Sequence, residues 1–279
     1  MNDANKLSYE IRRLVLDCSK QANVGHIGSC LSIAEILGAL YADVLRGEPD
    51  GSDRDRFILS KGHAALALYA ALVRTGVIER HELDRFCGEG TELSAHPEHA
   101  LIGVDFATGS LGHGLSYATG AALAARLHGS ERRVFVLLSD AECNEGSVWE
   151  AAMFSAHHRL ANLIAIVDAN GQQALGKTRD VLDMEPLVDR WDSFGWNVHE
   201  VDGHDAEAIG TTISGLVTSQ AAPHVLLART TFGKGVSYME DQLAWHYWPM
   251  SDDQYRRAVD EVEQSERDRL LGVGQRTGR

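Results

Sequence analysis

The hydrophobic positions along the chain follow two kinds of pattern. Apolar side chains recur every three or four positions over residues 7–22, which predicts a helix with one buried face, and a second helix is expected over 32–46. Continuous β-type apolar runs are instead typical of strands that are buried on both faces. Such runs lie at 57–60, 134–139, 163–168, 196–203 and 224–230.

The order of these elements predicts the fold class. Helical patterns lie between the β-type runs, and the one over 63–76 ends at Gly76, as helices often do. Alternation of strand and helix favours an α/β fold with a mostly parallel sheet and helices on both of its faces. No linker rich in Pro, Gly or Ser divides the chain, so we expect one main domain over 1–250, followed by a C-terminal helix and polar tail over 251–279.

One segment does not fit the alternation. Residues 88–113 are rich in glycine and polar side chains and are long for a loop. Long loops in compact domains are usually functional or mobile, so this segment is a candidate for part of a site.

The unit from residue 134 to residue 170 is the first to indicate chemistry. Asp140 directly follows one apolar run, and Asn170 lies just past the next. If the two strands are adjacent and parallel, both side chains lie at the edge of the sheet where open α/β folds bind ligands. Their oxygens suit Mg²⁺, which completes its shell with waters and ligand phosphates. From spacing alone the alternative stays open that both residues are ordinary loop caps.

The helix between these two strands carries a capping signal of its own. Ser147 and Glu150 match the S-x-x-E capping box, which predicts that the helix begins at Ser147. Helical spacing then predicts that Trp149 and Met153 face the core.

Composition and charge narrow the function classes. The hydrophobic share of 44% is sufficient for a sizeable core. The formal net charge is −14, with no basic stripe to offset it, which disfavours nucleic acid as a partner. In so acidic a chain, a bound polyphosphate needs a metal cation as its counter-charge.

The cysteines and the hydropathy bear on location. Cys18, Cys30, Cys87 and Cys143 have no zinc-type spacing, and so few thiols favour a reducing compartment. The N-terminal segment lacks the apolar core of a signal peptide, and no run approaches the ~18 apolar residues of a membrane span. We therefore expect a soluble, cytoplasmic protein without a membrane contact.

Several segments, in order along the chain, resemble transketolases. "SDAECNEG", with Asn170 thirty positions after Asp140, is similar to the thiamine diphosphate motif GDG…N, except that Ser139 and Ala141 replace both glycines. "VGHIGSC", "DRFILSKGH", "SAHPE" and "FATGSLGHG" are similar to further transketolase segments, and "GKGVSYMEDQLAWH" looks like the ending of small N-terminal subunits. The chain is identified as a member of the transketolase family, resembling the thiamine diphosphate/Mg-binding subunit of a two-subunit enzyme.

The resemblance implies a thiamine diphosphate-binding fold and specific binding residues. Mg²⁺ would be held by the side chains of Asp140 and Asn170 and by the backbone carbonyl of Gln172. Contacts with the cofactor are expected from His63, Gly109, Leu111, Asp140, Ala141, Asn170 and His246.

The resemblance also implies a reaction and the residues that perform it. A two-carbon ketol (glycolaldehyde) unit would pass from a ketose donor to an aldehyde acceptor. The catalytic residues expected from the resemblance are His26, His63, His96, His246 and Glu145. Imidazoles that titrate near neutrality suit the proton transfers of such a reaction. His26 and His96 would face the substrate hydroxyls, and Glu145 would reach toward a glutamate of a partner.

A partner is part of the same expectation. In this family the activating glutamate belongs to the pyrimidine-binding half, so we expect a C-terminal transketolase subunit of roughly 300 residues and an α₂β₂ assembly. Without that partner the chain is expected to be inactive. Tyr247 and Trp248 stand where a glycine is usual, which favours an unusual sugar or sugar-phosphate-like substrate, for example a non-phosphorylated or carrier-bound one.

Two alternatives remain open at this stage. One is another thiamine diphosphate enzyme, such as a 1-deoxyxylulose-5-phosphate synthase or a 2-oxo acid dehydrogenase α subunit. The other is a non-catalytic subunit that binds the cofactor or a partner, which the altered GDG motif motivates.

Overall fold

Five parallel strands form the central sheet of the computed structural model, which describes residues 4–216 and 222–272. The spatial order is β1-β2-β3-β7-β6, and every neighbouring pair is parallel. The strands are β1 (Arg56–Leu59), β2 (Val134–Ser139), β3 (Leu163–Ala169), β6 (Asn197–Asp202) and β7 (His224–Arg229). All five strands expected from the apolar runs are confirmed, and no predicted bound differs from the observed one by more than one residue.

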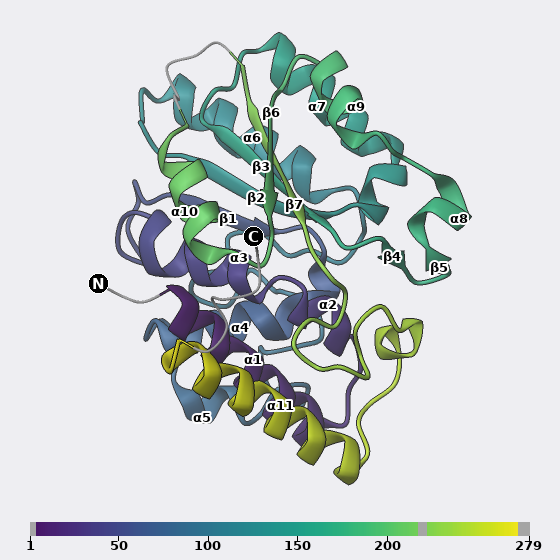
Figure 1. The fold of residues 1–279 in the computed structure, drawn as a ribbon. Helices are drawn as coiled ribbons and strands as arrows, with labels where there is room; N and C mark the ends of the chain where they lie inside the picture. Colours follow the sequence, from purple (N-terminus) through teal and green to yellow (C-terminus); the bar gives the residue numbers. More distant parts are fainter. Residues whose placement is uncertain (1–3, 217–221, 273–279) are drawn as a thin grey trace.

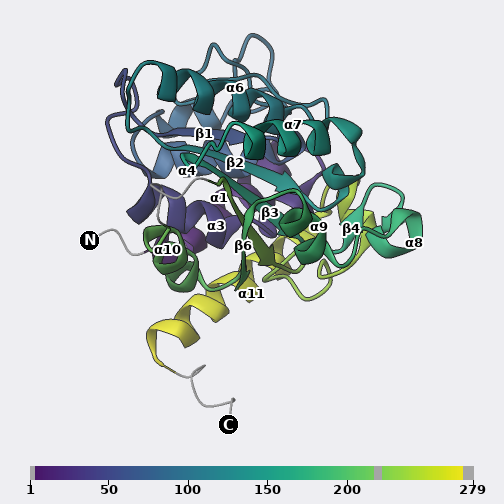
Figure 2. The same cartoon turned by 90° about the horizontal axis from the view of Figure 1, so that it is seen from above.

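Helices cover both faces of this sheet, as the sequence predicts (Figures 1 and 2). One layer consists of α1 (Ala4–Ala22), α3 (Ala34–Ala39), α4 (Ala65–Arg74), α10 (Ala206–Ser214) and α11 (Asp252–Leu270). The other consists of α6 (Gly114–Leu127), α7 (Gly146–His157) and α9 (Leu187–Ser193). Along β2 the side chains alternate, because Phe135 and Leu137 pack in the first core while Val136 and Leu138 pack in the second.

Short elements connect the strands and the longer helices. The helices are α2 (Ile27–Leu31), α5 (Arg80–Leu83) and α8 (Thr178–Leu182), and the hairpin is β4 (Gln172–Gln173) with β5 (Gly176–Lys177). The turns are the π-helical η1 (Leu40–Val44) and the 3₁₀ turns η2 (Gly62–Ala64), η3 (Ala141–Asn144) and η4 (Leu243–His246). Residues 88–113 contain neither helix nor strand, as expected for a loop.

The expected start of α7 is wrong. The helix begins at Gly146, and its N-cap residue Glu145 makes no side-chain cap. The Ser147 hydroxyl instead donates a hydrogen bond to the carbonyl of Gly112 at 3.0 Å, so a tertiary contact replaces the capping box. Met153, expected in the core, is 53% exposed. The buried stripe runs along Val148, Ala151, Ala152 and Ser155.

The C-terminal part of the chain continues the first layer. Helix α11 lies against α1 (Figure 1), and the rest of the predicted tail, from residue 273, is outside the described residues. The division into a domain over 1–250 and an appendage over 251–279 stays a prediction. Among the described residues, no helix is both long and apolar enough to span a membrane.

Candidate functional site

Asp140 and Asn170 lie together at the carboxyl-end edge of the sheet, because β2 and β3 are neighbours. The carboxylate of Asp140 accepts hydrogen bonds from the backbone N–H groups of Ala141 and Gly171, each at 2.8 Å. The side-chain oxygen of Asn170 accepts the N–H of Gln172 at 2.9 Å. The three residues expected to ligate a metal therefore belong to one hydrogen-bonded turn cluster.

The surroundings of Asp140 disfavour its charged form. Burial, and then the charge of Asp168, raise the pKa of Asp140 to about 7, against hydrogen bonds from Gly171 and Ala141 that lower it. Among residues 4–216 and 222–272, no three His, Cys, Asp or Glu side chains group to hold a metal ion. A metal at this edge would thus rely on one carboxylate with amide and backbone oxygens, a donor set that suits Mg²⁺.

Three histidines from distant parts of the chain form a cluster near this edge. His26 precedes α2, His63 lies in η2 and His246 ends η4, and their ring centroids are 5.4 to 5.8 Å apart. The Nδ1 atoms of His26 and His246 are buried and have no hydrogen-bond partner in the part of the chain that the structure describes. Since buried polar atoms are normally paired, these two indicate a site for polar groups of a ligand.

The environment of the cluster keeps its imidazoles neutral. Burial, followed by the charge of Lys61, lowers the pKa of His63 well below its usual range. Burial, followed by the charges of His26 and Lys61, lowers the pKa of His246 to about 4. Burial, His96 and Lys61 also lower the pKa of His26. These shifts move the three rings away from the titration near neutrality that the sequence led us to expect. A neutral imidazole can still accept a hydrogen bond at one nitrogen and donate an N–H at the other.

The backbone of His26 is itself unusual. It adopts the left-handed conformation, with φ 60° and ψ 20°, which is uncommon for a residue other than glycine. Gly25 beside it allows close packing, because a Cβ there would lie 2.3 Å from the carbonyl oxygen of Tyr247. Backbone strain of this kind is concentrated at functional sites.

The long loop brings His96 to the same place. A Cβ on Gly62 would lie 2.9 Å from the Gly109 nitrogen, so only a glycine next to His63 lets the loop approach. Gly109 has φ 152°, and a Cβ there would come within 3.1 Å of the His96 ring. The four predicted histidines are thus gathered around one site. Leu111, two residues after Gly109, is 38% exposed.

Comparisons with known proteins identify the family. The description "Transketolase, thiamine diphosphate binding domain" matches residues 4–262. The chain belongs to the transketolase family. This membership confirms the expected family, fold and transketolase-type ketol transfer. It also confirms that the domain is one that binds thiamine diphosphate.

Relatives of similar length support the same assignment. A protein from Phocaeicola vulgatus, described as one subunit of an apulose-4-phosphate transketolase, is 41% identical, over 91% of this chain and 91% of the relative. A 6-deoxy-6-sulfo-D-fructose transketolase subunit from Clostridium sp. is 39% identical, over 91% of this chain and 94% of the relative. These names favour a transketolase over the other thiamine diphosphate enzymes considered from the sequence.

Solved structures agree in fold. The crystal structure of transketolase from Campylobacter jejuni superposes with a TM-score of 0.88 at 28% identity and covers 94% of this chain. A transketolase structure from Pichia stipitis gives a TM-score of 0.87 at 30% identity and covers 93% of this chain. The chain spans 43% of the Campylobacter jejuni protein and 40% of the Pichia stipitis protein.

The two residues that replace glycines of the transketolase motif take part in the hydrogen bonds of the turn after β2. Ala141 is the first residue of η3, and its N–H is bound by Asp140. The Ser139 hydroxyl accepts the N–H of Glu142 at 3.2 Å and so supports the same turn.

Glu142 is a buried residue of the site to which the sequence pattern assigned no role. This carboxyl group is fully buried and accepts hydrogen bonds from the Ser60 hydroxyl at 2.5 Å, from Gly112 N–H at 2.9 Å and from Ser139 N–H at 3.0 Å. It therefore joins the ends of β1 and β2 to the loop before α6. Nothing in the local sequence distinguishes it from the exposed Glu145, three positions later.

Sequence reasoning also missed a buried ion pair beneath the site. Lys61 donates to the carboxylate of Asp168, and the two side chains are 1% and 0% exposed. The available signal was a charged residue at the end of each of two apolar strands, "FILSK" and "LIAIVD".

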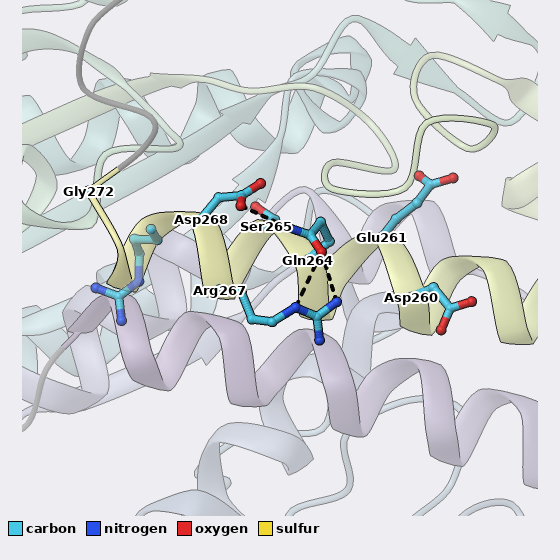
Figure 3. Close-up of a pocket in the computed structure, with 8 residues that line it drawn as sticks. Asp260, Glu261, Gln264, Ser265, Arg267, Asp268 and Gly272 are labelled. Atoms are coloured by element: carbon cyan, nitrogen blue, oxygen red, sulfur yellow. Dashed lines mark hydrogen bonds between the residues drawn. The ribbon is translucent and has the colours of Figure 1, made fainter.

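A surface pocket on the C-terminal helix is separate from this chemistry. Figure 3 shows it along the second half of α11, and it contains none of the predicted site residues. It is lined by Asp260, Glu261, Gln264, Ser265, Arg267, Asp268, Arg269 and Gly272. Its side chains bond mainly to one another along the helix, as Arg267 does to Gln264, so it adds nothing to the site.

Proposed function

We propose that this chain is the thiamine diphosphate- and Mg²⁺-binding subunit of a two-component transketolase. The main observation behind the proposal is that two groups of polar residues lie close together at the carboxyl ends of the strands. One is the oxygen-rich turn of Asp140 and Asn170, where burial and a neighbouring carboxylate disfavour the charge of Asp140. The other is the histidine cluster, where two buried ring nitrogens lack partners among the described residues.

The metal would be held by this chain's own oxygens. The ligands proposed are the Asp140 carboxylate, the Asn170 amide oxygen and the Gln172 backbone carbonyl. Waters and the diphosphate of the cofactor would complete the shell. The metal would also hold Asp140 ionised, since its pKa is raised to about 7 by burial and by Asp168.

The cofactor when bound supplies the carbanion chemistry of two-carbon transfer, and the protein supplies placement and proton transfer. His63 and His246 are proposed to contact the diphosphate or the reacting substrate through neutral ring nitrogens. His26 and His96 are proposed to bind and exchange protons with substrate hydroxyls. Gly109, Leu111 and Ala141 are proposed to lie along the cofactor.

A partner is proposed to close the site. The relatives of equal length are named as transketolase subunits, which implies that each works with a second chain. Glu145 is exposed at the same edge and is proposed to reach toward a glutamate of the partner. The assembly proposed is α₂β₂ with a pyrimidine-binding C-terminal subunit. We also place the protein in the cytoplasm, where its four free cysteines remain reduced.

The substrate proposed is a ketose donor with an aldehyde acceptor. One relative is named for apulose 4-phosphate and another for a sulfonated fructose, so the named sugars differ in their charged group. Tyr247 and Trp248, both exposed beside His246, are proposed to meet the end of the sugar away from the carbonyl. They support a donor other than a common sugar phosphate.

The proposal is tested by calorimetric titration of thiamine diphosphate into the reconstituted two-subunit complex, with and without Mg²⁺. We expect Mg²⁺-dependent binding, and we expect Asp140→Ala to weaken it by about 100-fold or more, because a direct ligand is lost. Asp180→Ala, which removes an exposed carboxylate on α8, is the matched control and should bind as the native chain does. Binding that needs no Mg²⁺, or that survives Asp140→Ala, would contradict the proposal.

A further inference from the structure

Asp168, at the end of β3, is a buried carboxylate that the proposed function does not use. It is fully buried, and four donors converge on it. They are the Lys61 ammonium, the Ser32 hydroxyl at 2.8 Å, the Asn170 amide nitrogen at 2.8 Å and the Thr230 hydroxyl. These donors come from four separate segments of the chain, which the fold brings together around one carboxylate.

The two oxygens of Asp168 have different partners. Oδ2 accepts from Lys61, Ser32 and the Nδ2 of Asn170, whereas Oδ1 accepts from Thr230. Lys61 is itself held in place, because it also donates to the carbonyl of Ser29 at 3.2 Å. An ammonium and three other donors around one carboxylate require an ionised, acceptor-only group. Such a group can bind only the NH₂ end of a neighbouring amide.

The consequence falls on Asn170. With its NH₂ group bound to Asp168, the amide oxygen must point the other way, into the turn, where it accepts Gln172 N–H at 2.9 Å. A carbonyl oxygen has two lone pairs, so it can still bind a cation. If the amide turned over, it would present N–H donors where a cation needs an oxygen.

We infer that Asp168, anchored by Lys61, is a positioning residue that fixes the oxygen end of the Asn170 amide beside Asp140. The inference rests on the proposed role of Asn170 as a metal ligand. Side chains that orient a metal ligand commonly account for roughly 10- to 100-fold of metal affinity.

A side-chain exchange tests the orientation directly. In Asp168→Asn, residue 168 no longer demands the NH₂ end of Asn170, and the affinity of the reconstituted complex for Mg²⁺ should fall by about 10- to 100-fold. In the double variant Asp168→Asn/Asn170→Asp, the amide at 168 donates to a carboxylate at 170 that has a second oxygen for the metal. We expect this exchange to regain most of the affinity. A single variant with native affinity, or a double variant no better than the single one, would overturn the inference.

A second variant guards against loss of folding, since Asp168→Asn leaves Lys61 buried without its charge partner. Lys61→Met/Asp168→Leu replaces the ion pair with apolar side chains of similar size, which buried pairs often tolerate. It should stay folded, with a somewhat lower melting temperature because the Thr230 hydroxyl and the Asn170 amide lose their acceptor, and should bind Mg²⁺ about 10-fold or more weakly. Thr230→Val removes a hydrogen bond from the other oxygen of Asp168 and should keep native affinity.

The readout is Mg²⁺ affinity by calorimetry, not turnover alone. If the native complex binds no Mg²⁺, the proposed function fails. If the native complex binds Mg²⁺ and Asp140→Ala abolishes binding, while Lys61→Met/Asp168→Leu leaves it unchanged, only the positioning role fails.

Discussion

At the residue scale, several features of the fold disfavour protonation of the His246 ring. Its ring is buried, stacks on Phe232 at 5.3 Å and lies beside two other imidazoles. Burial, His26 and Lys61 lower its pKa to about 4, so protonation of this ring is resisted by the folded chain. The free imidazole of an unfolded chain titrates near 6.5, and the difference makes folding stability depend on pH.

The sign follows from that difference. The unfolded chain takes up a proton at His246 below pH 6.5 while the folded chain does not until about pH 4, so stability is complete above 6.5 and falls as the pH drops. By pH 5 the loss from this residue is about 2 kcal/mol. His246→Phe should remove it, so the variant's melting temperature should drop less between pH 7.5 and pH 5 than that of the native chain. An equal drop in both would refute this. His99→Phe, at an exposed position, is the control.

At the scale of elements, the segment that carries His246 is tied to the hairpin that follows Asn170. The Tyr247 hydroxyl donates to the carbonyl of Ala174 at 2.6 Å. The side chain of Gln172 donates to the carbonyl of Asp241 at 3.3 Å. These two bonds set the position of the histidine cluster relative to the proposed metal turn, although they join segments on opposite sides of β7 in the sequence.

Tyr247→Phe removes one of these ties and little else. We expect the loss of one hydrogen bond, about 1 kcal/mol, to speed backbone hydrogen exchange over residues 241–250 by roughly fivefold. Tyr238→Phe is a matched control, because its hydroxyl also donates to a backbone carbonyl at 2.6 Å, that of Gln254 on α11. Mass-spectrometric exchange should show the control unchanged over 241–250. Equal hydrogen-exchange protection over 241–250 in both variants would show that the Tyr247 hydrogen bond does not stabilise this segment.

Elements and contacts differ in how far the sequence predicts them. The strands β2 and β3 were predicted almost to the residue, because burial on both faces leaves a continuous apolar run. The start of α7 was not predicted correctly, because the Ser147 hydroxyl donates a hydrogen bond to Gly112, 35 positions earlier, and does not cap its own helix. The pairing of Lys61 with Asp168 spans 107 positions, and the sequence shows only two charges at strand ends.

At the scale of the whole molecule, α7 leads away from the site and exposes two large apolar side chains between Glu150 and His157. It begins beside the exposed Glu145, and two turns on Met153 and Phe154 are 53% and 43% exposed. Helical spacing predicted Met153 inside the core, and the structure places it on the surface instead. Adjacent exposed apolar side chains on a helix are typical of a contact with another chain. The face of α7 is therefore where the proposed partner is expected to pack.

A charge on that face should weaken the assembly without unfolding the chain. We expect Met153→Asp to raise the dissociation constant with the C-terminal subunit by about 10-fold or more, since a carboxylate would lose its water at the interface. Leu127→Asp is the control: this leucine is 76% exposed, but it ends α6 at the opposite edge of the sheet from the site. Both variants should melt near the native temperature, because both positions are exposed. Sedimentation velocity of the mixed subunits distinguishes them, and equal association of the two variants would place the partner on another face.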